Sequence, residues 1–506
     1  MILNHQDLQP SPKYMNEGQN AQDSDPELSK GALKLRKRKL NKLPWSHNGK
    51  HPGNKLFWQI LLIMFRTSWR YLFRNKYVEK IPQFDGGRVI SSIHINGLVD
   101  PVVIISTQER RVISMGRHDI MTMPLIGWFA RRMGAQPVIR RAEINKGVAD
   151  SDYATKINHR TLLTMSNCIS SGHNAIVMPE GKSHQDTKLH KFRTGIMRFA
   201  INAATISNEK NLPLPALQPV GLHYRCHHKF RTDLFVEYIE PIIVKPTKDF
   251  EISKQLIEGK WIEPRKEDVI RLRDRLFEKL TPITPNSPDW ETYRTWHLMG
   301  HIIANKKNKP LQTYREEVLA AREIREKIQK ITVDKDIINP IKKASKILDE
   351  YNLDGRSLNK DGIKNENSNL SGILGLILML VTSPISIPSS GFQAFLGLYL
   401  GDRTDEGIDA RTTYHLMAAI FSPIIFWPPL ALIISYNIVG PTPSLIILPI
   451  IVMITFHISN IIFLHGYDYW NDFLMARRRQ KLAKSPEGNI LSSIISQANS
   501  NLDVLK

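Results

Sequence analysis

The sequence contains only two cysteines, Cys168 and Cys226, among its 506 residues. Two cysteines cannot form the disulfide framework of a small secreted protein, so a reducing environment facing the cytosol is the simpler interpretation. The first 29 residues are polar and lack the apolar core that a secretory signal needs. We therefore expect no secretory signal there, and we expect a disordered, basic N-terminal tail over residues 1–50.

Acidic residues are also scarce, since 48 Asp and Glu stand against 69 Lys and Arg and leave a formal net charge of +21. This balance favours a polyanionic partner, which can be nucleic acid, anionic lipid or a phosphorylated substrate. Residues 30–42 hold seven basic residues and no acid, and Trp and Phe mix with Arg over residues 54–77. We predict an interfacial amphipathic helix over residues 51–79. Packing of this helix on the domain's own core is the alternative.

Charge is absent altogether from two long blocks, residues 367–401 and 412–467. The second block predicts two transmembrane helices, about 413–436 and 444–465, each long enough to cross a bilayer. The first block is interrupted by SPISIPSSG and leaves pieces too short to cross, so we predict a re-entrant segment. The basic sequence ARRRQKLAK follows the last span and predicts a cytoplasmic tail over residues 468–506, on the same side as the α/β domain.

Short apolar runs alternate with helix-like segments over residues 80–250, and many of these runs are β-branched and continuous, as in strands covered on both faces. This pattern predicts an α/β domain. The expected strands are 88–93, 101–105, 111–115, 135–140, 174–179, 214–224 and 234–244. Amphipathic patterns over residues 251–366 predict a helical subdomain.

One histidine and one carboxylate lie in the polar break of the apolar stretch VISSIHINGLVDPVVIIS. His94 follows an expected strand and Asp100 lies six residues later. An imidazole can remove the proton of an attacking hydroxyl while a carboxylate fixes its tautomer. The same residues also suit an ordinary link, in which Asn96 and Gly97 form a turn and Asp100 caps a helix that begins at Pro101. Spacing alone leaves both interpretations open.

Later segments supply groups that suit a phosphate. Residues 178–195, MPEGKSHQDTKLHKFRTG, place Pro-Glu-Gly at the end of a strand and open a helix near Lys191 and Arg193. Exposed N–H groups at a helix start, together with basic side chains, can hold a phosphate. The expected strand 135–140 ends at Arg140.

With these segments in order, the chain resembles the glycerolipid O-acyltransferase superfamily, which moves fatty acyl groups from CoA or acyl carrier protein onto glycerol phosphates. HINGLVDP resembles the family's first block, IGWFARRMGAQPVIR the second, MPEGKSHQDTKLHKFRTG the third and LPALQPVGLHY the fourth. The five residues between His94 and Asp100 are similar to the spacing of the fungal glycerol-3-phosphate / dihydroxyacetone-phosphate acyltransferases. HYRCHHKFRT resembles the same branch. The resemblance covers about residues 55–470.

The resemblance implies an α/β acyltransferase domain over residues 80–250 with a central mixed sheet covered by helices, a helical insert and a C-terminal membrane region. It implies that His94 is the catalytic base and that Asp100 orients it. The residues that it implies for acceptor binding are Arg140, Glu180, Gly181, Ser183, Arg193 and Gly195. Acyl-CoA or acyl carrier protein is the expected co-substrate. We expect no cofactor and no metal, because the HYRCHHK cluster does not offer an evident closed set of four ligands.

We accordingly expect a membrane-bound enzyme that acylates the sn-1 hydroxyl of glycerol 3-phosphate, and also dihydroxyacetone phosphate, for phospholipid synthesis. The rival in the same class is acylation of 1-acylglycerol 3-phosphate to phosphatidate. A non-catalytic lipid-binding protein is a different class, against which the intact His94, Asp100 and Pro-Glu-Gly set argues. Charge alone suggests a nucleic-acid binder, which the predicted spans oppose. We expect an integral membrane protein whose catalytic domain faces the cytoplasm, in the endoplasmic reticulum of a eukaryote or the cytoplasmic membrane of a bacterium.

Overall fold

The computed structural model describes residue 28 and residues 31–330, 335–366, 368–401, 403 and 410–501. The tail predicted to be disordered over residues 1–50 lies outside these ranges for residues 1–27, 29 and 30. For residues 31–50 the prediction is wrong, because they contain α2 (Lys37–Asn41), and Leu40 and Leu43 are buried against Met121 and Ala135 of the α/β domain.

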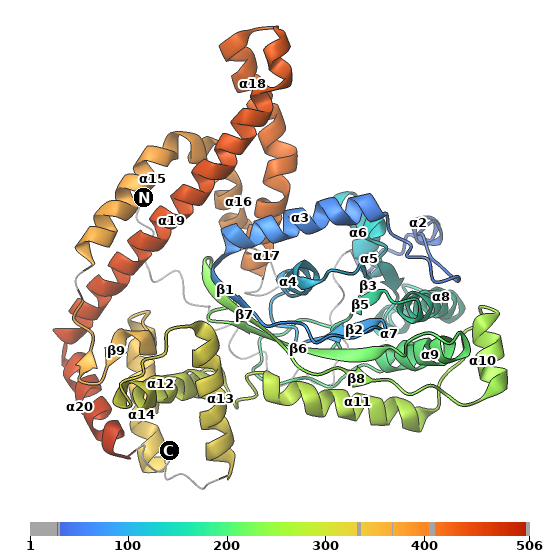
Figure 1. Ribbon diagram of the computed structural model, residues 1–506, viewed down its shortest axis with the longest axis horizontal. Coiled ribbons are helices and arrows are strands. Elements are labelled where there is room, and N and C mark those ends of the chain that lie inside the picture. The colour runs from blue at the N-terminus through green and yellow to red at the C-terminus, as the bar shows by residue number, and fades with distance from the viewer. Residues whose placement is uncertain are drawn as a thin grey trace.

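A mixed sheet organises the α/β domain (Figure 1). Its strand order is β1-β7-β6-β2-β5-β3-β4, and β8 pairs with β6. Neighbours from β6 to β4 run parallel, whereas β7 and β8 run antiparallel to β6, and β1 runs parallel to β7. The prediction of a mixed sheet is confirmed. The strands are β1 (Phe73–Val78), β2 (Arg88–Ser91), β3 (Val112–Arg117), β4 (Gln136–Val138), β5 (Asn174–Ile176), β6 (Ala216–Tyr224), β7 (Thr232–Tyr238) and β8 (Ile242–Ile243).

Helices cover both faces of this sheet. On one face, α3 (Lys55–Leu72) and α4 (Val99–Thr107) pack into a core with Ile90 and Ile93. On the other face, α8 (Ser151–Ser170), α9 (Gly195–Glu209) and α11 (Lys266–Leu280) pack around Val89. Helix α11 lies in the range predicted for the helical subdomain, yet it belongs to the layer that covers the sheet.

The expected strand over residues 101–105 is wrong, because these residues lie in α4. Strands β2 and β3 both run parallel to β5, and consecutive parallel strands need a crossover connection, which is usually a helix. The β-branched run therefore becomes a helix that is buried on nearly all sides and packs inside the core, so the topology overrides the local strand propensity.

The predicted interfacial helix is shorter than residues 51–79, since α3 ends at Leu72 and the next six residues form the edge strand β1. One face of α3 packs on the domain core, as the alternative interpretation held. Its buried side chains are Trp58, Leu61, Phe65, Trp69 and Leu72. The other face exposes Leu56, Ile60 and Ile63, whose exposed fractions are 66%, 50% and 66%. Contact of this exposed face with lipid stays a prediction.

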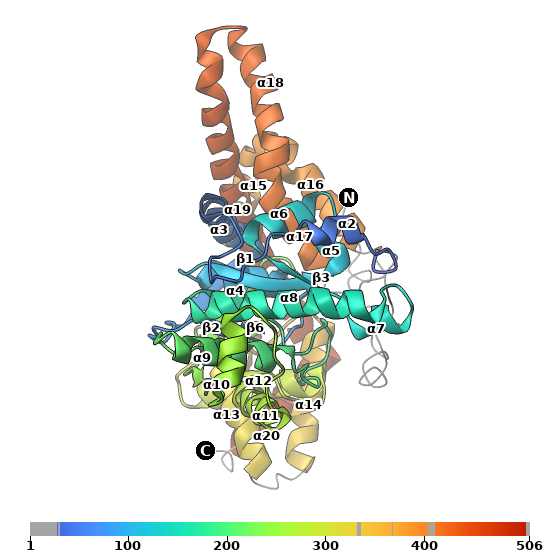
Figure 2. The same ribbon diagram turned by 90° about the vertical axis from the view of Figure 1, so that its right-hand side faces the viewer.

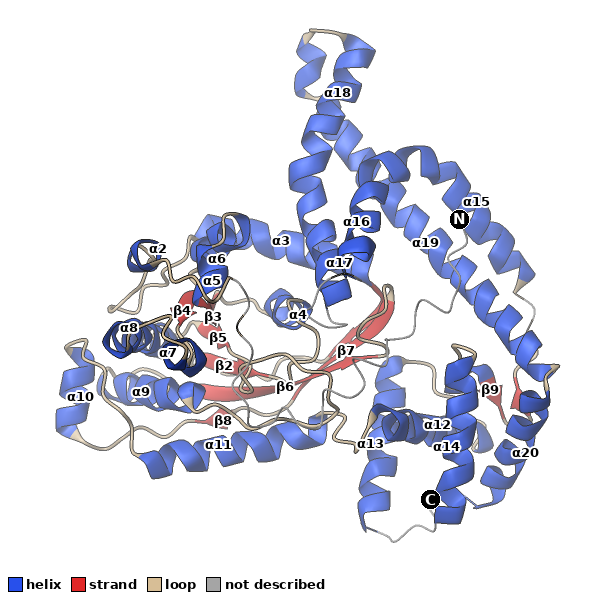
Figure 3. Cartoon of the chain, turned by 180° about the vertical axis from the view of Figure 1, so that it is seen from behind, coloured by secondary structure: helices blue, strands red, loops and turns tan. Residues whose placement is uncertain are grey.

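A helical subdomain lies beside the β6–β7 side of the sheet (Figure 3). It consists of α12 (Trp290–Lys306), α13 (Tyr314–Lys330) and α14 (Lys335–Glu350), with α20 (Pro486–Asn501) from the C-terminal tail packed into the same core. The predicted tail after the membrane region is thus part of a folded unit over the described residues.

Among the residues that the structure describes, three helices are long and apolar enough to cross a membrane: Asn369–Gly401, Arg411–Val439 and Leu448–Ala483. The hairpin formed by α18 (Trp427–Val439) and the start of the third helix projects from the rest of the molecule (Figure 2). The second contains the predicted span 413–436, and the third contains the predicted span 444–465 from Leu448 onward. In the first, α15 (Asn369–Ser386) and α16 (Phe392–Gly401) join through a π-helical turn at Ile387–Gly391. Helix α15 rises towards this turn and α16 descends from it (Figures 1 and 3). A re-entrant path within a bilayer stays a prediction.

The last apolar helix, α19 (Leu448–Ala483), is attached to the α/β domain by two ion pairs. Arg74 forms a bidentate pair with Asp472 at 2.6 and 2.7 Å. Arg231 pairs with Asp468, with 3.0 Å between Nε and Oδ1, and also donates to the backbone carbonyls of α3 and β1. The C-terminal end of α19 therefore lies on the same side of the apolar segments as the α/β domain. The compartment that this side faces stays a prediction.

Candidate active site

The site lies where three neighbouring parallel strands end. Strand β2 lies between β5 and β6, and residues at or beyond their carboxyl ends converge there. His94 follows β2, Glu180 follows β5, and Tyr224 is the last residue of β6. Ligand sites of open α/β sheets form at this edge, where helices and loops leave the strands.

Asp100 is fully buried and accepts four hydrogen bonds. Its Oδ2 atom lies 2.9 Å from Nδ1 of His94 and accepts the backbone N–H groups of Ile95 and Asn96 at 2.9 and 2.8 Å. Its Oδ1 atom accepts the hydroxyl of Tyr224 at 2.8 Å. A carboxylate held in this way keeps the Nδ1 proton of His94 in place and leaves Nε2 as the ring nitrogen that takes a proton. The His94 side chain is 17% exposed.

The alternative in which Asp100 caps a helix is wrong. Helix α4 begins at Val99 and has no side-chain cap, and Asp100 lies within its first turn. The carboxylate turns back to the loop before the helix, where it binds two backbone N–H groups and the imidazole. The local turn that was expected at Asn96 and Gly97 is present, since Val99 N–H donates to the Asn96 carbonyl at 2.9 Å and Gly97 has a φ of +37°.

Glu180 joins the Pro-Glu-Gly loop to the backbone of His94. Its Oε2 atom accepts the His94 N–H at 3.0 Å, and its Oε1 atom accepts the His190 N–H at 2.7 Å and lies 2.8 Å from Nε2 of His184. The backbone N–H of His184 donates to the His94 carbonyl at 3.0 Å. Gly181 has a φ of +77°, which favours glycine. The third block therefore supports the backbone of the proposed base from both sides.

His184, Asp186 and His190 form a cluster whose nitrogen and oxygen atoms lie within 4.8 Å of one another. By residue type such a set suits zinc. The two imidazole rings, however, stack face to face at 3.9 Å with 7° between their planes. Each Nε2 also contacts a carboxylate, that of Glu180 at 2.8 Å and that of Asp186 at 2.6 Å. We interpret the cluster as a hydrogen-bonded support for Glu180.

The other expected binding residues fall into two groups. Ser183 and Arg193 are exposed beside Gly181, and Gly195 begins α9. A Cβ atom on Gly181 would lie 3.2 Å from Cγ of Arg193, so these two residues are in contact. Arg140 lies apart: it pairs with Glu143 at 2.6 Å at the start of α7 (Arg141–Asn145). Within the described part of the chain, no hydrogen bond or ion pair joins Arg140 to His94, Asp100 or Glu180.

Sequence reasoning missed two residues that contact the loop carrying His94 and Asp100, namely Tyr224 and His227, and it missed the side-chain partners of Asn96 within that loop. Tyr224 binds Asp100, and Asn96 donates from Nδ2 to the carbonyl of His227 at 2.9 Å. The ring of His227 stacks on Trp290 at 5.4 Å. Asn96 lies in the first block and Tyr224 ends the fourth, so the quoted motifs contain them. Only the fold shows which partners they have, because 124 residues separate Tyr224 from Asp100.

Replacing Tyr224 by phenylalanine should lower kcat by about tenfold, because one oxygen of the buried Asp100 carboxylate loses its donor. Burial raises the pKa of Tyr224 well above 10, so the hydroxyl remains a donor at any physiological pH. Steady-state kinetics of the variant check this. Tyr153→Phe is a matched control on the α8 surface, and equal losses in both variants would contradict the role of Tyr224.

His227 makes folded stability depend on pH. Burial lowers its pKa from 6.5 to about 4. As the pH falls from 6.5 to 4, the unfolded chain gains a proton at this residue that the folded chain does not. Folded stability should therefore decrease on acidification, by up to about 1.4 kcal/mol per pH unit for one such histidine. The midpoint of thermal inactivation should fall less steeply with pH in His227→Gln than in the native chain. Parallel curves would contradict this.

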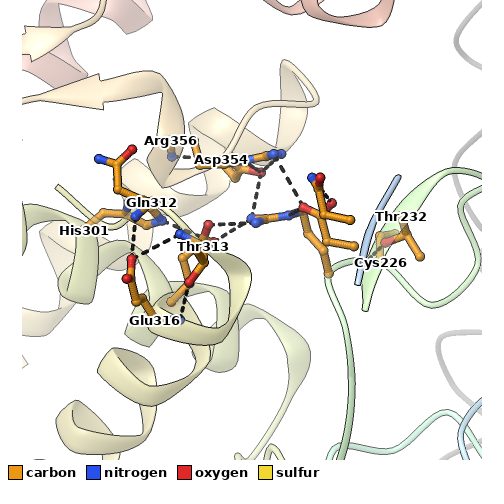
Figure 4. Close-up of polar contacts among 12 residues, drawn as sticks. Cys226, Thr232, His301, Gln312, Thr313, Glu316, Asp354 and Arg356 are labelled. Atoms are coloured by element: carbon orange, nitrogen blue, oxygen red, sulfur yellow. Dashed lines mark hydrogen bonds and ion pairs between the residues drawn. The ribbon is translucent and has the colours of Figure 1, made fainter. Parts of the chain in front are cut away.

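A buried ion network follows Tyr224 directly and binds the helical subdomain to the sheet (Figure 4). Arg225 lies 2.8 Å from Asp233 of β7, forms a bidentate pair with Glu317 of α13 at 2.6 and 2.7 Å, and lies 3.6 Å from Asp354. Burial alone would raise the pKa of Glu317, but hydrogen bonds from His301 and Arg225 hold it well below its usual range. The helical subdomain is thereby attached to the end of the strand that carries Tyr224.

Residues 73–220 match the family model described as Acyltransferase. Over 120 residues the chain is 31% identical to glycerol-3-phosphate O-acyltransferase 2 of Saccharomyces cerevisiae, which covers 23% of this chain and 14% of that protein. Over 149 residues it is 30% identical to glycerol-3-phosphate O-acyltransferase 1 of the same yeast, with 28% and 17% covered. An uncharacterised acyltransferase of Schizosaccharomyces pombe is 28% identical over 116 residues, with 23% and 16% covered.

The crystal structure of the 1-acyl-sn-glycerophosphate (LPA) acyltransferase from Thermotoga maritima is also similar, at 18% identity and a TM-score of 0.27, with 42% of this chain and 79% of that chain covered. A TM-score of this size supports no comparison of geometry. The matched stretches span less than a fifth of each yeast relative's length. His94, Asp100 and Glu180 all lie inside the family match. Residues 73–220 therefore contain an acyltransferase domain, and parts of the chain are similar to the two yeast glycerol-3-phosphate O-acyltransferases.

Proposed function

We propose that this chain transfers a fatty acyl group from acyl-CoA or acyl carrier protein to the sn-1 hydroxyl of glycerol 3-phosphate, with dihydroxyacetone phosphate as a second acceptor. The observation that carries the proposal is the buried Asp100, which holds Nδ1 of a partly exposed His94 inside the acyltransferase match. The names of the two yeast relatives support the choice of acceptor.

The reaction needs one base and no covalent enzyme intermediate. Nε2 of His94 removes the proton of the acceptor hydroxyl as its oxygen attacks the thioester carbonyl. The new C–O bond gives a tetrahedral oxyanion, which then collapses and breaks the C–S bond. The proton on His94 passes to the leaving thiolate, so the enzyme returns to its starting state. Throughout, Asp100 holds the imidazole in one tautomer and balances the charge of the imidazolium.

We propose that Arg193 and the start of α9 bind the acceptor phosphate. Arg193 is exposed beside Gly181 in the loop whose Glu180 holds the His94 backbone. A guanidinium and the free N–H groups at a helix start favour a phosphate. Ser183 and Gly195 belong to the same surface. Arg140 is the weaker candidate because its guanidinium already pairs with Glu143.

We propose an integral membrane protein whose catalytic domain faces the cytoplasm. The ion pairs of α19 support one side for the α/β domain and the C-terminal tail. The run Arg477–Arg479, which follows the last apolar segment, supports the cytoplasm as that side.

Purified full-length chain in lipid nanodiscs tests this function. Labelled acyl-CoA is offered with glycerol 3-phosphate, dihydroxyacetone phosphate or 1-acylglycerol 3-phosphate, and the lipid product and free thiol are measured. We expect product with the first two acceptors. Product with the 1-acyl acceptor alone would replace the proposal by phosphatidate synthesis. No product with any of the three, from acyl-CoA or from acyl carrier protein, would favour a non-catalytic lipid-binding protein.

A further inference from the structure

The loop that carries His94 and Asp100, here called the catalytic loop, is held by one side-chain amide that contacts two distant parts of the chain. Asn96 is 1% exposed and lies two residues after His94. Its Nδ2 donates to the His227 carbonyl in the β6–β7 connection at 2.9 Å. Its Oδ1 accepts the hydroxyl of Thr412, which is 316 residues away in the sequence. Both ends of the Asn96 amide are thus satisfied by groups outside the loop.

Thr412 belongs to the first turn of α17 (Ala410–Phe421), where the second apolar span begins. The next residue, Thr413, contacts the same loop, because its hydroxyl accepts the backbone N–H of Leu98 at 3.2 Å. One turn further on, Leu416 is fully buried in the core that also contains Val99 of α4. The start of this apolar helix is therefore packed against the loop that carries His94 and Asp100.

We infer that the first turn of α17 is part of the active site, where Thr412 acts through Asn96 as a positioning residue for the catalytic loop. The inference rests on the acyl transfer proposed above. Neither threonine touches the reacting atoms. Their effect is to fix the backbone at Asn96 and Leu98, on the path between His94 and the carboxylate that orients it.

This arrangement gives the apolar helix a role beyond anchoring. The His94–Asp100 contact depends on the backbone N–H groups of Ile95 and Asn96, both of which donate to the same carboxylate oxygen. A loop released from α17 loses the constraint that keeps these donors aligned. The catalytic loop should then be formed for less of the time, which lowers turnover without removing any group that binds the acyl donor.

Three variants separate this role from general damage to the fold. Thr412→Val keeps the side-chain shape and removes the hydroxyl, whereas Thr412→Ser keeps the hydroxyl. Thr455→Val is the matched control, because the Thr455 hydroxyl donates only within α19, to the Ile451 carbonyl at 3.0 Å. We expect Thr412→Val to lower kcat by about five- to tenfold, since a buried acceptor loses its partner. The KM for the acyl donor should stay unchanged, and Thr412→Ser and Thr455→Val should remain near the native rate.

A double-mutant comparison tests the route through Asn96. If Thr412 acts through Asn96, then Thr412→Val should add nothing in an Asn96→Ala background. Additive losses, or an effect of Thr412→Val no larger than that of Thr455→Val, would overturn the inference. A rise in KM for the acyl donor with an unchanged kcat would also overturn it, because that pattern belongs to substrate binding.

Hydrogen exchange of the full-length chain in nanodiscs gives a readout that needs no activity. The amides of Ile95 and Asn96 should exchange faster in Thr412→Val than in the native chain and in Thr455→Val. Equal exchange rates in the native chain, Thr412→Val and Thr455→Val would contradict the inference even if the chain proves to be an active acyltransferase. Conversely, faster exchange in a chain that acylates none of the acceptors would support the contact and reject the proposed function.

Discussion

Replacing His94 by alanine is expected to lower kcat by about 10²- to 10⁴-fold, the range that a positioned general base contributes. The imidazole is held at Nδ1 by Asp100 and is partly exposed beyond the end of β2. The thioester is already activated, and the loss should therefore fall on the step in which the acceptor hydroxyl is deprotonated. Lipid product formed from labelled acyl-CoA measures this loss directly.

The matched control is His159→Ala, which removes a 42% exposed imidazole from the outer face of α8. It should retain the native rate. The KM for the acyl donor should change little in His94→Ala, since the imidazole acts on the acceptor hydroxyl. An undiminished rate in His94→Ala would show that another group is the base and would remove the main support for the proposed mechanism.

Replacing Arg225 by methionine is expected to lower the stability of the folded chain by about 3–5 kcal/mol, because removal of one partner leaves buried charge uncompensated. The side chains of Asp233 and Glu317 are 6% and 3% exposed, and both pair with this guanidinium. Asp354 also approaches it at 3.6 Å. The helical subdomain should then separate from the sheet more readily than any other part of the described structure.

The measurement is the midpoint temperature of unfolding in nanodiscs. It is followed as the fraction of the chain that still elutes as a soluble, monodisperse peak after heating. Arg271→Met is the matched control, because the Arg271 side chain is 75% exposed and its pair with Asp268 lies on the surface of α11. Such a pair contributes only about 0–1 kcal/mol. Equal midpoints for the two variants would contradict a structural role for Arg225.

Sequence reasoning could identify the site residues that lie close together in the chain or in a motif at a fixed position after a strand. His94 and Asp100 lie close together in the chain, and the structure brings them within 2.9 Å. Glu180 lies in a motif with a fixed position after a strand, and it too reaches the catalytic loop. The partners of Asn96 and Asp100 could not be predicted, because Thr412 and Tyr224 approach them only through the tertiary fold. A hydroxyl at such a distance in the sequence leaves no local pattern.

The same distinction explains the errors in the fold. Residues 101–105 and 73–78 each carry a local pattern that favours the wrong element, a strand in the first case and a continued helix in the second. Their structure follows from connections that periodicity does not reveal, namely the crossover between β2 and β3 and the pairing of β1 with β7. Strands that follow a buried, continuous pattern, such as β6, were predicted well because both their faces are covered.

The length of helix α19 also bears on the distance between the α/β domain and the membrane. Its 36 residues extend for about 54 Å, whereas the hydrocarbon core of a bilayer is about 30 Å thick. Under the proposed membrane topology, the remaining length extends beyond the lipid, and the ion pairs of Asp468 and Asp472 hold the α/β domain against it. The α/β domain cannot then rotate or slide along α19 without breaking the contacts of Arg74 and Arg231. Under the proposed topology, His94 is consequently held at one distance from the bilayer, and the proposed acceptor and acyl donor have to meet at that distance.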